Sequence, residues 1–136
     1  MENPTQFHNV LEFHNTYGAH IESKPVLPKE DVRKLRFDLL EEEWQEYVEA
    51  EKAHDLVGIA DALADMIYII NGTAVSYGLP LNEIFAEVHS SNMSKLGEDG
   101  KPVYREDGKV LKGPNYFRPK IKDIIEKHIS LPKNDQ

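Results

Sequence analysis

Carboxylate side chains are concentrated between residues 41 and 65, at spacings that could build a metal site. Glu42, Glu43 and Glu46 lie within five residues of one another, and Asp61 and Asp65 stand four apart in an otherwise apolar stretch. Residues three or four apart are neighbours on one face of a helix. Burying an unpaired carboxylate is costly and normally forces its protonation. Two such stripes can face each other only with cations between them, so the pattern predicts a metal site.

A helical wheel separates these carboxylates from the surface charges. At about 100° per residue, Glu41 and Glu49 fall on an all-polar arc, which indicates a solvent face. Glu43 and Glu46 lie among apolar residues, and Glu42 sits at the border. We therefore expect the second group to point inward.

Two other readings of the acidic residues have to be weighed. In the first, Arg33 or Arg36 neutralises them in buried ion pairs, but two arginines do not balance about five inward carboxylates. The second is a di-iron bundle, which needs a Glu-x-x-His pair on each of two helices. Only Glu51 and His54 offer such a pair, so we reject this reading. Because the chain has no cysteine, oxygen ligands and hence Mg²⁺ or Mn²⁺ are favoured.

Four helices are predicted to position these groups. Asn3 and Asp55 are candidate N-caps, and Gly18 and Gly78 are candidate ends. The third helix is apolar in almost every direction, which predicts burial on all sides. The expected helices cover approximately residues 4–17, 29–54, 55–77 and 81–96.

The composition changes after residue 96. An Asp-Gly pair between Val103-Tyr104 and Val110-Leu111 predicts a small hairpin. Isoleucines at helical spacing in residues 121–129 predict a short terminal helix, and the last five residues are expected to fray. We predict a single all-α domain over residues 1–136, with core helices at about 4–96 and an extension at about 97–130.

Charge and composition limit the partners. A net charge of −8 over 136 residues argues against non-specific binding to a nucleic acid polymer, which depends on Lys and Arg. No apolar run reaches the roughly 18 residues of a membrane span, and the N-terminus lacks the basic and apolar regions of a signal peptide. A cytoplasmic protein without a membrane partner is therefore expected.

The acidic motifs resemble those of the all-alpha NTP pyrophosphohydrolase superfamily. Its members include MazG-like enzymes, dimeric dUTPases and phosphoribosyl-ATP pyrophosphohydrolases. Residues 42–46 (EEWQE) match the motif E-E-x-x-E in full. The second motif, E-x-x-D, matches imperfectly, because Asp65 has Ala62 at the glutamate position and Asp61 has Gly58. The primary aspartate ligand and the number of metal ions therefore stay open.

The resemblance implies a four-helix-bundle-like MazG-type fold and hydrolysis of a nucleoside triphosphate to a monophosphate and pyrophosphate. It implies Mg²⁺, with Mn²⁺ as an alternative, that bridges the phosphates to an acidic protein. Water would be activated by the metal or by a spare glutamate such as Glu42. The implied metal ligands are Glu42, Glu43, Glu46, Asp61 and Asp65, and the implied catalytic residues are Glu42, Glu43 and Glu46.

The fourth helix and the extension are similar to the tail of a MazG-like subgroup. This implies phosphate contacts by Lys95 and Lys112, and contacts to the substrate by Asn92, Asn115 and Tyr116. The alternatives are that both lysines are solvated surface charges and that the aromatic tail, Phe117 above all, anchors the extension to the helices.

Assembly and the exact reaction are further expectations. An apolar third helix with few elements to cover it favours a homodimer or homotetramer, with residues 97–117 reaching toward a neighbouring subunit. The alternative functions are a phosphoribosyl-ATP pyrophosphohydrolase and a non-catalytic helical oligomerisation or binding module. The sequence does not specify the base or sugar of the substrate.

Overall fold

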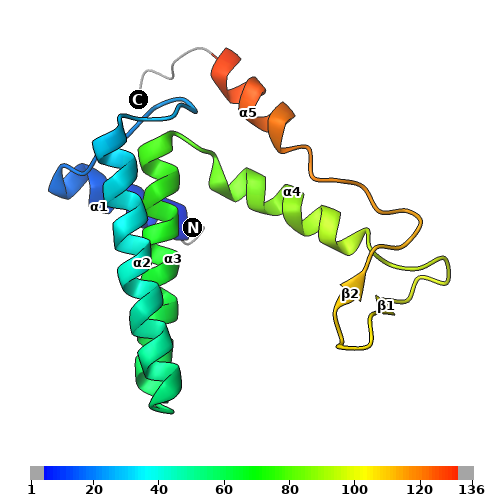
Figure 1. The fold of residues 1–136 in the computed structure, drawn as a ribbon. Coiled ribbons are helices and arrows are strands. Elements are labelled where there is room, and N and C mark those ends of the chain that lie inside the picture. Colours follow the sequence, from blue (N-terminus) through cyan, green and yellow to red (C-terminus); the bar gives the residue numbers. More distant parts are fainter. Residues whose placement is uncertain (1–4, 132–136) are drawn as a thin grey trace. The chain divides into compact units, whose positions relative to one another are not determined.

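Five helices and one two-stranded hairpin make up residues 5–131, the part of the chain that this computed structural model describes (Figure 1). This arrangement confirms the predicted all-α class, and the hairpin lies where the sequence predicted it. The elements are α1 (Gln6–Tyr17), α2 (Glu30–Lys52), α3 (Leu56–Tyr77), α4 (Leu81–Met93), β1 (Val103–Tyr104), β2 (Val110–Leu111) and α5 (Ile121–Ser130).

Several helix ends were predicted correctly. Gly18 and Gly78 close α1 and α3 in the left-handed conformation, with φ of 73° and 67°. The Asp55 side chain caps α3 by accepting a hydrogen bond from the Gly58 N–H. The side chain of Thr5 caps α1, whereas the predicted cap Asn3 lies outside the described residues. The last five residues, expected to fray, also lie outside them.

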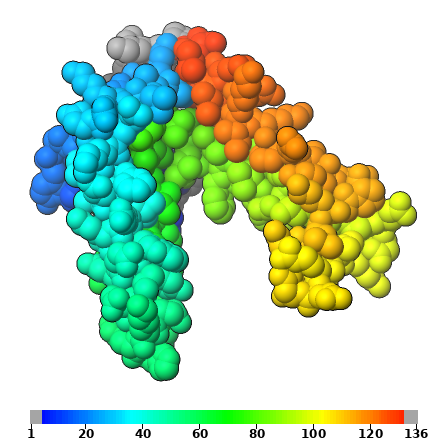
Figure 2. All heavy atoms as spheres, in the orientation of Figure 1, coloured from blue at the N-terminus to red at the C-terminus, as the bar shows by residue number. Residues whose placement is uncertain are grey.

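Contacts divide the chain into two units. We call residues 5–81 the N-terminal unit and Asn82–Leu131 the C-terminal unit. Figure 2 draws the first in blue to green and the second in light green to red. The break falls at the start of α4, which the sequence analysis had grouped with the preceding helices. Whether the two units act as one domain stays a prediction.

In the N-terminal unit, α3 packs against both α1 and α2 (Figure 1). At the centre of this packing, the side chain of Arg36 makes polar contacts with α3 beside Gly72. The Arg36 guanidinium is buried there and donates hydrogen bonds to the Ile69 carbonyl at 2.8 Å and to Thr73 Oγ1 at 3.2 Å. A Cβ on residue 72 would collide with this guanidinium and press on the His14 ring. Glycine therefore permits the close approach of the three helices.

The expectation that α3 is buried on all sides is wrong for the single chain. Its buried residues are Ala62, Asn71, Gly72, Ala74, Val75 and Ser76, while Leu63 and Ile70 are 46% and 44% exposed. Trp44 on α2 is also half exposed. A three-helix unit has too few elements to cover so many apolar side chains. The exposed large ones on α2 and α3 are Leu35, Phe37, Trp44, Leu56, Val57, Leu63, Ile67, Tyr68 and Ile70.

Among the described residues, α3 also has the length and composition of a membrane-spanning helix. The expectation that no apolar stretch reaches this length is therefore wrong for α3, whose apolar residues are interrupted only by a few polar ones such as Asp61 and Asp65. One such helix is weak evidence for a membrane span, because the core helices of soluble proteins share these properties.

The C-terminal unit is held together by polar contacts to α4. Glu83 accepts hydrogen bonds from His128 Nε2 at 2.6 Å and Lys127 Nζ at 3.3 Å, which ties α5 to α4. The segment before α5 is fixed at Phe117, whose backbone oxygen accepts from Ser91 Oγ at 2.8 Å. Its N–H donates to Ser94 Oγ at 3.1 Å. These contacts show that the backbone of Phe117 anchors the extension, one of the two roles considered for this residue.

Candidate metal centre

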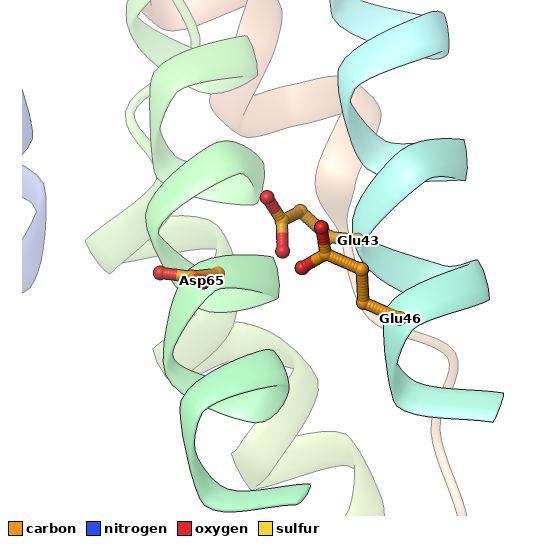
Figure 3. Close-up of side chains that lie close together, drawn as sticks. All are labelled: Glu43, Glu46 and Asp65. Carbon is orange, nitrogen blue, oxygen red and sulfur yellow. The ribbon is translucent and has the colours of Figure 1, made fainter. Parts of the chain in front are cut away.

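Three of the predicted metal ligands come together on the α2–α3 hairpin. Glu43, Glu46 and Asp65 each offer one carboxylate oxygen, and these three oxygens lie within 4.8 Å of one another. In Figure 3, Glu43 and Glu46 extend from α2 toward α3, which carries Asp65. We call these three residues the carboxylate cluster.

The short α2–α3 connection sets this arrangement. The Asp55 N–H donates to the Ala50 carbonyl at 3.0 Å, and the Asp55 side chain caps the first turn of α3 directly after this connection. His54 completes the turn with a positive φ of 53°. Glu46 lies eight residues before this turn and Asp65 eleven after it, so antiparallel packing brings them to similar heights.

The electrostatics of the cluster centre on Glu43. Its side chain is half-buried, and its Oε2 is a fully buried acceptor without a hydrogen-bond partner in the described part of the chain. Desolvation, as the largest cause, and the neighbouring Glu46, Asp65 and Asp61 together raise the pKa of Glu43 from 4.5 to about 7. A buried acceptor next to like charges is stable only as a protonated acid or as the partner of a cation.

The other two predicted ligands lie outside the cluster. Glu42 and Asp61 are exposed, although the charge of Asp61 still acts on Glu43. Glu46 is exposed as well, so the expectation that it is embedded among apolar residues is wrong, while its direction toward α3 is as predicted. The ligand roles of Glu42 and Asp61 stay predictions.

The arginine alternative does not apply to this hairpin. Arg36 is engaged with the backbone and hydroxyl of α3, and no ion pair from Arg33 or Arg36 reaches the cluster within residues 5–131. The surplus of negative charge belongs to the whole N-terminal unit. Residues 5–81 carry fourteen acidic and six basic side chains, whereas residues 82–131 carry eight and nine. An uncompensated set of carboxylate oxygens suits a hard divalent cation.

The predicted substrate contacts all lie in the C-terminal unit. Lys95 is half-buried, and its carbonyl accepts a hydrogen bond from the Gly113 N–H at 2.8 Å. Lys112 Nζ lies 4.8 Å from the centre of the Tyr116 ring, a cation–π contact. Asn92 and Asn115 are exposed. The tail thus brings Lys112, Gly113 and Tyr116 back to the end of α4.

Sequence reasoning missed Asn71. This residue is 6% exposed and donates from Nδ2 to the Ile67 carbonyl at 3.0 Å. Its signal in the sequence is a single amide inside the apolar run of α3. A buried amide is retained at a cost unless its groups are used.

Comparison with known proteins places the chain in a family. The profile of phosphoribosyl-ATP pyrophosphohydrolase matches residues 10–92, more than half of the chain. The chain belongs to the phosphoribosyl-ATP pyrophosphohydrolase family. The match contains the whole carboxylate cluster, and it confirms the superfamily that residues 42–46 and 61–65 had indicated.

Individual relatives are more distant. An uncharacterised protein of Acanthamoeba polyphaga mimivirus is 28% identical over 127 residues, covering 90% of this chain and 47% of that protein. The chain therefore spans about half the length of this curated relative. A crystal structure from Exiguobacterium sp. 255-15, provisionally described as an NTP pyrophosphohydrolase, is 27% identical with a TM-score of 0.49. That comparison covers 94% of this chain and 95% of the other.

The raised pKa of Glu43 predicts the pH dependence of the metal-free protein. Because the folded-state pKa of about 7 exceeds the ordinary 4.5, the folded state favours the protonated acid. Its stabilising contribution is complete below pH 4.5 and is lost as the pH rises through 7. Urea unfolding in EDTA should therefore show that Glu43→Gln gains stability relative to the wild type between pH 4.5 and 7. Glu41→Gln, on the solvent face, should follow the wild type, and parallel curves for all three proteins would contradict the assignment.

Proposed function

We propose that this protein is a metal-dependent nucleoside triphosphate pyrophosphohydrolase. The observation that carries the proposal is the carboxylate cluster with its buried, unpartnered Glu43 Oε2. Family membership supports the same reaction class, since the family's name specifies hydrolysis that releases pyrophosphate. In this proposal the substrate is a nucleotide and the products are a nucleoside monophosphate and pyrophosphate.

The residues present fit a divalent cation. Three carboxylate oxygens within 4.8 Å of one another form an oxygen-only donor set, and thiolate ligands are excluded because the chain has no cysteine. Glu43, Glu46 and Asp65 would hold the ion, with Asp61 and Glu42 as further candidates. When bound, Mg²⁺ or Mn²⁺ supplies positive charge that neutralises phosphate oxygens and polarises them.

The chain's own part is to position the reactants and to move one proton. Glu42 is exposed beside Glu43 and is available as the base that takes a proton from water. The water oxygen then bonds to phosphorus, the α–β phosphoanhydride bond breaks, and pyrophosphate leaves. Lys95 and Lys112 are proposed to contact the phosphates, and Asn92, Asn115 and Tyr116 other parts of the substrate. The near balance of charge in the C-terminal unit suits an anion better than the acidic N-terminal unit does.

Phosphoribosyl-ATP is the second candidate substrate, favoured by the family match. Its hydrolysis breaks the same bond and uses the same residues. A panel of nucleoside triphosphates and phosphoribosyl-ATP, assayed for pyrophosphate release, separates the two. A non-catalytic binding module would release pyrophosphate from none of them. A cytoplasmic location stays part of the proposal.

Replacing one cluster ligand should remove activity and leave the fold intact. In Glu46→Gln, pyrophosphate release should fall about a hundredfold or more, because several kcal/mol of charge stabilisation is lost with the ligand. Glu46 is exposed, so thermal melting in EDTA should stay close to that of the wild type. Glu41→Gln is the matched control and should keep its activity. Near-normal turnover in Glu46→Gln would contradict the role of the cluster.

We also infer a homodimer or homotetramer, with residues 97–117 reaching toward a neighbouring subunit. The support is the exposed apolar surface of α2 and α3, where a second chain would remove Leu63 and Ile70 from water. Light scattering at micromolar concentration should give a mass well above 15.6 kDa. The double variant Leu63→Lys with Ile70→Lys should lower that mass, whereas Gln45→Lys, at an exposed polar position of α2 between Glu41 and Glu49, should not. A wild-type mass near 15.6 kDa rules the proposal out.

A further inference from the structure

A cavity of about 190 Å³ is lined by residues of α1 and α3, and none of its lining residues belongs to α2. Its lining combines an apolar base, one aromatic ring and three amides: Val10, Ala64, Ile67, Tyr68, Gln6, Asn9 and Asn71. The cavity is several times the roughly 30 Å³ share of a water molecule. It is smaller than the ~300–1,000 Å³ pockets that hold drug-sized ligands. Its size suits a fragment about as large as a single ring system.

Asn71 is the decisive group in this lining. Only 6% of its surface is exposed. Among the described residues, its side chain makes one hydrogen bond, from Nδ2 to the Ile67 carbonyl. A carbonyl can only accept, so this bond fixes which end of the amide is nitrogen. One N–H and Oδ1 are left over at a residue that lines the cavity. A donor and an acceptor side by side match the hydrogen-bonding edge of a nucleobase.

The other lining residues also suit a nucleobase, because they include an aromatic ring and two more amides. The Tyr68 ring is held edge-on against the Phe13 ring, with centroids 5.6 Å apart and planes at 90°. An aromatic ring in a cavity wall is a stacking surface for a flat heterocycle. Gln6 and Asn9 are exposed at the cavity and add two further amides from α1.

The cavity and the carboxylate cluster share α3. Ala64 immediately precedes Asp65, and Tyr68 follows Asp65 by three residues. At 1.5 Å per residue, Asn71 lies about 9 Å along the helix axis from Asp65. A nucleotide carries its phosphates and its base at opposite ends of a sugar, so one substrate requires two sites separated along the protein in this way.

We propose that this cavity is the nucleobase subsite of the enzyme, with Asn71 reading the edge of the base and Tyr68 packing on its face. The inference rests on the proposed function, because it takes the carboxylate cluster as the phosphate end. Asn115 and Tyr116 offer similar chemistry in the C-terminal unit. The Lys112 ammonium already lies over the Tyr116 ring, however, whereas the amide of Asn71 keeps unused groups at a cavity.

Calorimetric titration tests this subsite apart from catalysis. The probes are the common nucleoside 5′-monophosphates and, as a ligand without a base, inorganic pyrophosphate, each in the presence of Mg²⁺. We expect at least one monophosphate to bind the wild type. Asn71→Ala should weaken that binding about tenfold or more and leave pyrophosphate affinity unchanged. Asn15→Ala, an exposed asparagine of α1 outside the lining, should bind like the wild type.

The double variant Gln6→Ala with Asn9→Ala provides a second test in case Asn71→Ala does not fold. Both positions are exposed, so these substitutions should leave folding intact. It should also weaken monophosphate binding selectively. Equal loss of pyrophosphate binding, no binding of any monophosphate, or base discrimination that responds only to Asn115→Ala and Tyr116→Ala would overturn the subsite. So would a double variant that changes the oligomeric mass and not the affinity. If the wild type releases pyrophosphate but the variants do not weaken monophosphate binding selectively, the subsite alone is ruled out. If a monophosphate binds selectively through this cavity but no substrate is hydrolysed, the proposed function alone is ruled out.

Discussion

Uncompensated negative charge between two packed helices is the constraint on which this protein is built. Glu43, Glu46 and Asp65 bring three oxygens within 4.8 Å, and one of the Glu43 oxygens is buried without a partner. The energetic cost of this arrangement has to be met by a proton or by a cation. The structure around it is correspondingly fixed. Arg36 crosses to the α3 backbone and Gly72 leaves room for it, so the helices that carry the carboxylates are held at close range.

Much of the fold could be predicted from the sequence because its signals are local. Gly18, Asp55 and Gly78 mark helix ends through their own backbone and capping preferences, and the Asp-Gly turn marks the hairpin. The inward direction of Glu43 followed from helical spacing. The pairing that brings Glu43, Glu46 and Asp65 together also needed an antiparallel α2–α3 hairpin, whose short connection at residues 53–55 is seen in the structure.

What the sequence did not reveal depends on tertiary contacts. Periodicity cannot show whether an apolar helix is covered by its own chain, and α3 has too few neighbours to bury Leu63 and Ile70. Arg36 read as a possible partner for the acids, but its buried position directs it to the Ile69 carbonyl. Asn71 gave no motif at all. Its interest comes from the cavity that α1 and α3 form around it, which no spacing rule encodes.

Metal-dependent thermal stability tests the central claim most directly. Wild-type protein and Asp65→Asn would be melted in EDTA and in increasing Mg²⁺ or Mn²⁺. An ion that binds only the folded state adds about 2.7 kcal/mol of stability at a hundred times its Kd. The melting temperature of the wild type should therefore rise steadily with metal concentration, and that of Asp65→Asn should not. A wild-type protein that melts at the same temperature with and without either metal, or an equal rise in Asp65→Asn, would contradict the account.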